Sequence, residues 1–82
     1  MTRIDDVIHD LESLSQSAGT AQGTLDGLIS TLRGAASEVE AIGGSESGRM
    51  VAALDAAAEA CGRAQGDLDE VKSAVSSYVS SL

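Results

Sequence analysis

Few side chains in this sequence could carry out chemistry, and their spacing does not bring them together. His9 is the single histidine and Cys61 the single cysteine, so neither can pair with a residue of its own kind to bind a metal or form an intrachain disulfide. Asp67, Asp69 and Glu70 form an acidic cluster. Carboxylates that act as an acid/base pair or bind Ca²⁺ need a cleft around them, and the sequence indicates none.

Structural roles account better for these residues. His9 lies farthest from the apolar positions of its segment, which indicates a solvated surface residue. Cys61 lies among apolar positions, where a thiol behaves as a small hydrophobe; a redox role or an intersubunit disulfide is the alternative. The acidic cluster is typical of a solvated helix face. Because no nucleophile motif, phosphate-binding glycine loop or metal quartet is present either, we predict a protein that is not an enzyme and uses no cofactor or metal.

Length and charge narrow the class of protein further. The 82 residues carry a formal net charge of -8, which argues against nucleic acid or an anionic membrane surface as a partner. No stretch reaches the roughly 18 apolar residues of a membrane-spanning helix, and acidic residues interrupt the amino-terminal segment where a signal peptide needs an apolar core. We expect one domain, 1–82, made in the cytoplasm, without membrane insertion or a cleavable signal peptide.

Apolar residues recur at alternating spacings of three and four in both halves of the chain. This is the period of an amphipathic helix with coiled-coil character, and the absence of proline permits long helices. We predict helices at about residues 3–42 and 48–82, with Thr2 as the N-cap of the first. The series are Ile4, Val7, Leu11, Leu14, Ala18, Ala21, Leu25, Leu28, Leu32, Ala35, Val39 and Ile42, then Met50, Leu54, Ala57, Cys61, Ala64, Leu68, Val71, Val75, Tyr78 and Leu82.

The stretch EAIGGSESGRM separates the two series. Gly43 and Gly44 can adopt the left-handed conformation that ends a helix, and Ser45 or Ser47 can cap the next one. The connection, about residues 43–47, is too short for a linker and is typical of an αα-hairpin. We therefore predict an all-α fold, an antiparallel two-helix hairpin.

In such a hairpin, apolar residues should meet in layers whose residue numbers sum to 89. Leu28 then faces Cys61 and Leu25 faces Ala64, and five consecutive layers set a large residue against a small one. The hairpin is too small for a stable core of its own, so we expect it to dimerise. A solid two-helix rod also has no room for a pocket of enzymic size.

The positions that flank this seam on one side predict the dimer surface. Two hairpins packed antiparallel through them would form a four-helix bundle, with Gln22 and Gln65 near the crossing. The predicted interface residues are Ile8, Gln22, Ile29, Ala36, Val51, Ala58, Gln65 and Val79.

Glycines recur every four residues in the first helix. Gly19, Gly23 and Gly27 lie at the height of Gly62 and Gly66 on the second helix. One interpretation is a thin waist where another helix crosses closely. The other is a softened or broken middle of the first helix, since each interior glycine costs about 1 kcal/mol relative to alanine.

A helical hairpin of this length with a glycine turn at its midpoint resembles the WXG100 (ESAT-6-like) family of type VII secretion. Ile42, Gly43 and Gly44 stand at the Trp-x-Gly positions of that family. Its export signal, Tyr-x-x-x-Asp/Glu, would begin at Tyr78, but Leu82 stands at the acidic position. Tyr78 also fits the apolar seam, which favours core packing as its role.

The resemblance implies a secreted or co-secreted protein that dimerises with itself or with a related hairpin. Without the acidic signal residue, the chain would be the partner or chaperone of a signal-bearing helical protein, or of the helical leader of a toxin. The alternative is a cytosolic or phage structural or adaptor coiled-coil protein that is not secreted.

Overall fold

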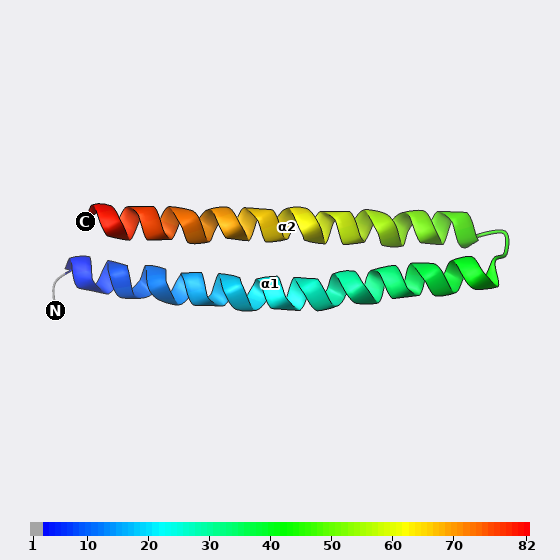
Figure 1. Cartoon of the computed structure of the whole chain (residues 1–82), viewed down its shortest axis with the longest axis horizontal. Helices are drawn as coiled ribbons and strands as arrows, with labels where there is room; N and C mark the ends of the chain where they lie inside the picture. Colours follow the sequence, from blue (N-terminus) through cyan, green and yellow to red (C-terminus); the bar gives the residue numbers. More distant parts are fainter. Residues whose placement is uncertain (1–2) are drawn as a thin grey trace.

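The computed structural model describes residues 3–82, which form two helices and no strand. Helix α1 spans Arg3–Ile42 and helix α2 spans Ser47–Ser81. The helices lie side by side and run antiparallel, so that α1 begins and α2 ends at the same end of the molecule (Figure 1). The predicted all-α hairpin is confirmed, whereas the predicted N-cap Thr2 lies outside the described residues.

Helix α1 runs without interruption through its glycine-rich middle. Its first turn carries Asp5 and Asp6, whose negative charge stabilises the amino-terminal end of the helix dipole. Thr20 and Thr24 donate hydrogen bonds from their hydroxyls to the backbone carbonyls four residues earlier, at 3.2 Å each. These bonds satisfy the polar side chains within the helix. Of the two interpretations of the glycines, a broken first helix is excluded, because α1 is continuous from Arg3 to Ile42.

The turn depends on two glycines with positive φ. Gly43 has a φ of 74° and Gly44 of 112°, values that side chains strongly disfavour. The Gly43 amide donates to the Val39 carbonyl at 2.9 Å, which closes the end of α1. Neither serine of the turn acts as the predicted cap: Glu46 occupies the N-cap position of α2 without a side-chain cap bond, and the Ser47 hydroxyl donates to the Gly44 carbonyl at 2.9 Å.

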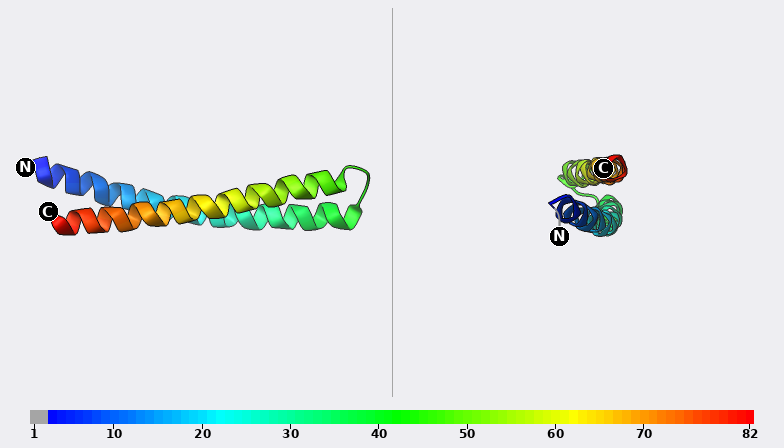
Figure 2. Two further views of the ribbon diagram at one scale, coloured as in Figure 1. Left: turned by 90° about the horizontal axis from the view of Figure 1, so that it is seen from above. Right: turned by 90° about the vertical axis from the view of Figure 1, so that its left-hand side faces the viewer.

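The molecule is a thin rod of 62 × 15 × 13 Å. Its helices cross at a shallow angle near their midpoints and separate toward the open end (Figure 2). Among the described residues only Ala18, Ala36, Ala58 and Val75 are buried. Two helices bury too little surface to form a larger core, so most apolar side chains remain partly in contact with water.

Candidate interaction surface

Within residues 3–82, the side chains that could take part in chemistry are not gathered in one place. His9, Asp67 and Glu70 are exposed, and Cys61 is a half-buried free thiol. Within residues 3–82 no three His, Cys, Asp or Glu side chains are grouped closely enough to hold a metal ion. Asp69 is also exposed, but it accepts a hydrogen bond from the other helix.

Each helix carries three adjacent rows of residues, spaced by seven, on the side that faces its partner. We call them the edge row, the middle row and the outer stripe. The edge row is Ile8, Ser15, Gln22, Ile29 and Ala36 on α1, with Val51, Ala58, Gln65, Lys72 and Val79 on α2. The middle row is Leu11, Ala18, Leu25, Leu32 and Val39, with Leu54, Cys61, Leu68 and Val75. The outer stripe is Val7, Leu14, Ala21, Leu28, Ala35 and Ile42, with Met50, Ala57, Ala64, Val71 and Tyr78.

The two helices contact each other through the edge and middle rows. Every residue named in these two rows is buried or half-buried, whereas Ile4, seven residues before Leu11 at the start of α1, is 56% exposed. Ala36 and Ala58, both in the edge row, are 5% and 2% exposed, among the lowest values in the described chain. Sequence analysis expected the seam to combine the middle row with the outer stripe. Both helices are instead rotated about their own axes, so that the edge row lies inside.

The predicted dimer interface stays a prediction, but its residues lie at the contact between α1 and α2 within the single hairpin. Ile8, Gln22, Ile29 and Ala36 of α1 lie against α2 instead of forming an exposed flank. The same holds for their counterparts on α2, which are Val51, Ala58, Gln65 and Val79. Two features of the edge row accompany this rotation: small alanines that allow close approach, and a set of polar contacts at the centre of the rod.

The polar contacts form a reciprocal arrangement that we call the clasp. Gln22 Nε2 donates to the Gln65 backbone carbonyl at 3.0 Å and to Asp69 Oδ1 at 2.7 Å. Gln65 Nε2 donates to the Gln22 backbone carbonyl at 3.0 Å and to Asp26 Oδ1 at 2.6 Å. Lys72 Nζ donates to Gln22 Oε1 at 2.9 Å. Gln22 and Gln65 therefore bind each other's helix inside one hairpin, and their place near a crossing of two hairpins stays a prediction.

A repeat in the sequence signals the clasp, and sequence reasoning overlooked it. Residues 19–26 read GTAQGTLD and residues 62–69 read GRAQGDLD, with six of eight positions identical. In both copies the glutamine precedes the aspartate by four residues, which places them one above the other on a helix. When the two copies pack antiparallel, each glutamine reaches the aspartate of the other helix.

The outer stripe is only partly covered by the hairpin. Four of its largest side chains are about half exposed: Leu14 by 49%, Leu28 by 44%, Met50 by 48% and Tyr78 by 52%. Its other members except Ala57 and Ile42 are half-buried. Ile42, at the turn, is 87% exposed. Because the edge rows of both helices lie on one side of the rod, both parts of the outer stripe lie on the opposite side. A contiguous apolar surface of this kind is typical of an interface.

The two parts of the outer stripe meet in a recess at the open end of the rod. Ile4, Val7, Tyr78 and Leu82 line this recess together with Arg3, around a volume of about 190 Å³. The apolar pattern had suggested that Tyr78 is a core residue. It is instead 52% exposed. It lies at the rim of the uncovered surface.

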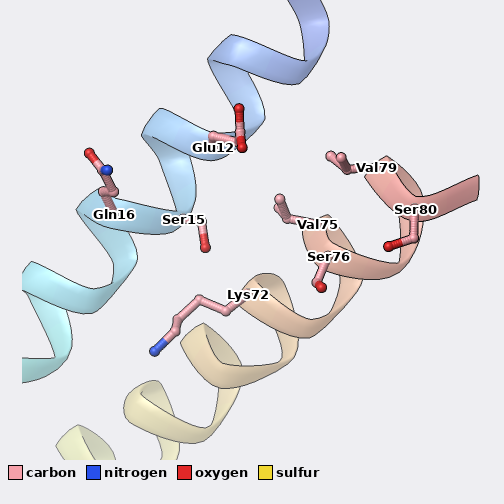
Figure 3. A pocket seen from close by; sticks show the side chains of 8 residues that line it. All are labelled: Glu12, Ser15, Gln16, Lys72, Val75, Ser76, Val79 and Ser80. Carbon is pink, nitrogen blue, oxygen red and sulfur yellow. The ribbon is translucent and has the colours of Figure 1, made fainter. Parts of the chain in front are cut away.

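A second groove lies on the edge-row side, toward the open end (Figure 3). It has a volume of about 370 Å³, which is larger than we expected for a solid rod. Ser15 is a short side chain in the edge row, and the helices diverge here, so the space between them is not filled. Glu12 and Lys72 also line the groove, but Lys72 extends between the helices to the clasp, and its ammonium group binds Gln22 there.

The glycines do not mark a close contact between the helices. A Cβ atom built on Gly19, Gly23, Gly27, Gly62 or Gly66 would meet nothing within 4 Å. The hairpin therefore does not require glycine at these positions. Gly23 and Gly66 lie on the side of each helix that faces away from the outer stripe, so the predicted waist does not coincide with the uncovered surface.

Comparisons with protein-family models, with curated proteins and with solved structures find no match to this chain. Neither helix in residues 3–82 has a stretch apolar and long enough to cross a membrane.

Proposed function

We propose that this protein acts by binding a second helical hairpin along its outer stripe, so that the two form a four-helix bundle. The observation that supports this proposal is the exposure of Leu14, Leu28, Met50 and Tyr78 on one side of a rod with almost no core of its own. In the unbound hairpin these side chains face water, and a partner that covers them supplies the missing hydrophobic burial.

The dimensions of the surface suit a second hairpin. A rod of 62 by 15 Å has a face of about 900 Å², close to the roughly 800 Å² that each partner contributes to a standard protein interface. A single helix laid on the same face would cover only part of it. A hairpin of the same length covers both halves of the stripe at once, and a second copy of this chain meets that requirement.

Charge is compatible with pairing of two copies. The chain is strongly acidic, with a net charge of -8, so two copies repel each other at long range. Arg3 borders the stripe at the open end, and Glu46 lies beside Met50 and Arg49 at the turn end. In an antiparallel pair, the open end of one copy meets the turn end of the other, which brings Arg3 near Glu46.

The resemblance to the WXG100 family supports a more specific role. The hairpin, its length and the turn at Ile42, Gly43 and Gly44 agree with that family, and Tyr78 is accessible at the open end. In this proposal the chain is a secreted or co-secreted partner or chaperone of a signal-bearing helical protein or toxin leader. Because Leu82 replaces the acidic signal residue, its export depends on that partner.

Association through the outer stripe is tested by light scattering with matched variants. Leu28→Asp places a charge in the centre of the stripe, and we expect it to raise the dissociation constant at least about tenfold. Ser30→Asp is the control, because Ser30 is exposed on the other side of the same helix. If wild type were monomeric at tens of micromolar, alone and with the helical product of a neighbouring gene, or if the two variants behaved alike, the proposed surface would be wrong.

Export is tested by expressing the chain together with its native type VII system. We expect it outside the cell only when a signal-bearing hairpin is present. Undiminished export in a strain that lacks every related hairpin would contradict the dependence on a partner. Association without any export would favour a cytosolic or phage adaptor role instead.

A further inference from the structure

Each helix of this hairpin could pack through either of two pairs of rows. The middle row belongs to both pairs, and the second row is either the outer stripe or the edge row. Every residue of the outer stripe is apolar, whereas the edge row includes Ser15, Gln22, Gln65 and Lys72. Hydrophobic burial alone would therefore turn the outer stripe inward. The structure has the more polar row inside.

We infer that the clasp selects this rotation, and that Gln22 and Gln65 are positioning residues that keep the outer stripe facing outward. The clasp connects the two helices through both edge rows at the centre of the rod, where the helices cross. The biological role of the clasp rests on the proposed function, because an outward-facing stripe is useful only to a protein that binds through it. The physical claim concerns a single chain and can be tested without a partner.

The geometry of the clasp makes it sensitive to rotation. Both hydrogens of each glutamine amide are used, one by a backbone carbonyl and one by an aspartate of the other helix. A backbone carbonyl is fixed in the helix, so it cannot follow a glutamine that rotates away. Turning the outer stripe inward would move both edge rows apart and would break these four bonds together. The bond from Lys72 to Gln22 would be lost with them.

Specific polar contacts in an otherwise apolar interface commonly select one arrangement among several of similar stability. In this hairpin, the polar contacts of the clasp would select how each helix is rotated about its own axis. The competing explanation is that the small side chains Ala18, Ala36 and Ala58 alone set the rotation by allowing close approach. The two explanations differ in what happens when the glutamine amides are removed and the alanines are kept.

Disulfide trapping within one chain distinguishes the two rotations. Ile29→Cys with Ala58→Cys, in a Cys61→Ala background, joins edge-row positions one heptad from the clasp and reports the rotation seen in the structure. Leu28→Cys with the native Cys61 joins positions that share a layer when the outer stripe faces inward. Both pairs are oxidised in the same glutathione buffer, and the intrachain product is separated from interchain dimers on a non-reducing gel.

We expect the edge-row pair to close at least about threefold faster than the outer pair in the otherwise unchanged chain. Adding Gln22→Ala and Gln65→Ala should slow the edge-row pair and accelerate the outer pair, so that the ratio falls to one or below. General loosening would not move the two rates in opposite directions. Asp26→Asn with Asp69→Asn is the matched control, because each asparagine keeps an acceptor oxygen and should preserve the ratio.

If the glutamine variants lose helicity by circular dichroism, Asp26→Ala with Asp69→Ala provides the second test. It removes one bond from each amide and should shift the ratio in the same direction by a smaller factor. An unchanged ratio in every folded variant that weakens the clasp would overturn the inference and assign the rotation to the alanines. Failure to find a binding partner would leave these ratios unaffected, so the two proposals fail separately.

Discussion

Gln22 uses all of its hydrogen-bonding groups inside the hairpin, although it lies in a row that is otherwise mainly apolar. Its amide nitrogen donates twice across the helix contact, and its oxygen accepts from Lys72. A half-buried polar group is costly when its partners are removed, because the remaining groups lose their bonds without regaining full contact with water.

We therefore expect Gln22→Ala to lower the free energy of unfolding by about 1–3 kcal/mol, since it removes three bonds and leaves the Gln65 and Lys72 groups without them. Urea unfolding followed by circular dichroism measures this loss. The control is Gln16→Ala on the exposed side of the same helix, which should change stability by no more than about 0.5 kcal/mol. Equal effects of the two substitutions would show that the clasp contributes nothing to stability.

The two helices are the part of the structure that the sequence predicts well. Alternating spacings of three and four require a helix, two glycines require its end, and the matching of Gln22 with Gln65 follows from the length of the turn. The rotation of each helix does not follow from this pattern. Leu28 and Ile29 are neighbours of similar hydrophobicity, and the spacing admits either one inside the contact. The choice depends on side-chain bonds between the helices, for which the repeated AQGxLD motif is the visible sign.

Glycines within and between the helices should respond oppositely to substitution. Gly23→Ala should raise the free energy of unfolding by about 0.5–1 kcal/mol, because a Cβ there meets nothing within 4 Å and alanine favours the helix. Gly43→Ala should lower it by about 1–2 kcal/mol, because its φ of 74° disfavours a side chain. Thermal unfolding of the two variants and of wild type shows whether each substitution raises or lowers the free energy of unfolding. Stabilisation by Gly43→Ala would contradict the observed turn.

At the scale of the whole molecule, the long thin hairpin has little interior and much exposed apolar surface. Its Cα radius of gyration is 18.5 Å, compared with about 12 Å for a compact domain of this length. The missing interior corresponds to the outer stripe, so the shape and the surface lead to the same expectation of a partner that lies along the rod.

Small-angle X-ray scattering tests this arrangement. A partner bound lengthwise thickens the rod, so the longest dimension should stay close to the 62 Å of the single hairpin while the mass doubles. Association at the tips would instead nearly double the length. The Leu28→Asp variant, measured at the same concentration, should have the mass of a single chain and the same longest dimension.

Because α1 begins and α2 ends at the same end of the rod, a mechanical load applied there pulls the two helices apart progressively from that end (Figure 1). Contacts then break one layer at a time, from the edge-row residues Ile8 and Val79 toward the turn, and each layer resists only weakly. The clasp lies about halfway along this path, where five hydrogen bonds must break within a short extension. In an optical trap the hairpin should therefore open in two stages, with a pause when its outer half is released. Gln22→Ala with Gln65→Ala should remove the pause.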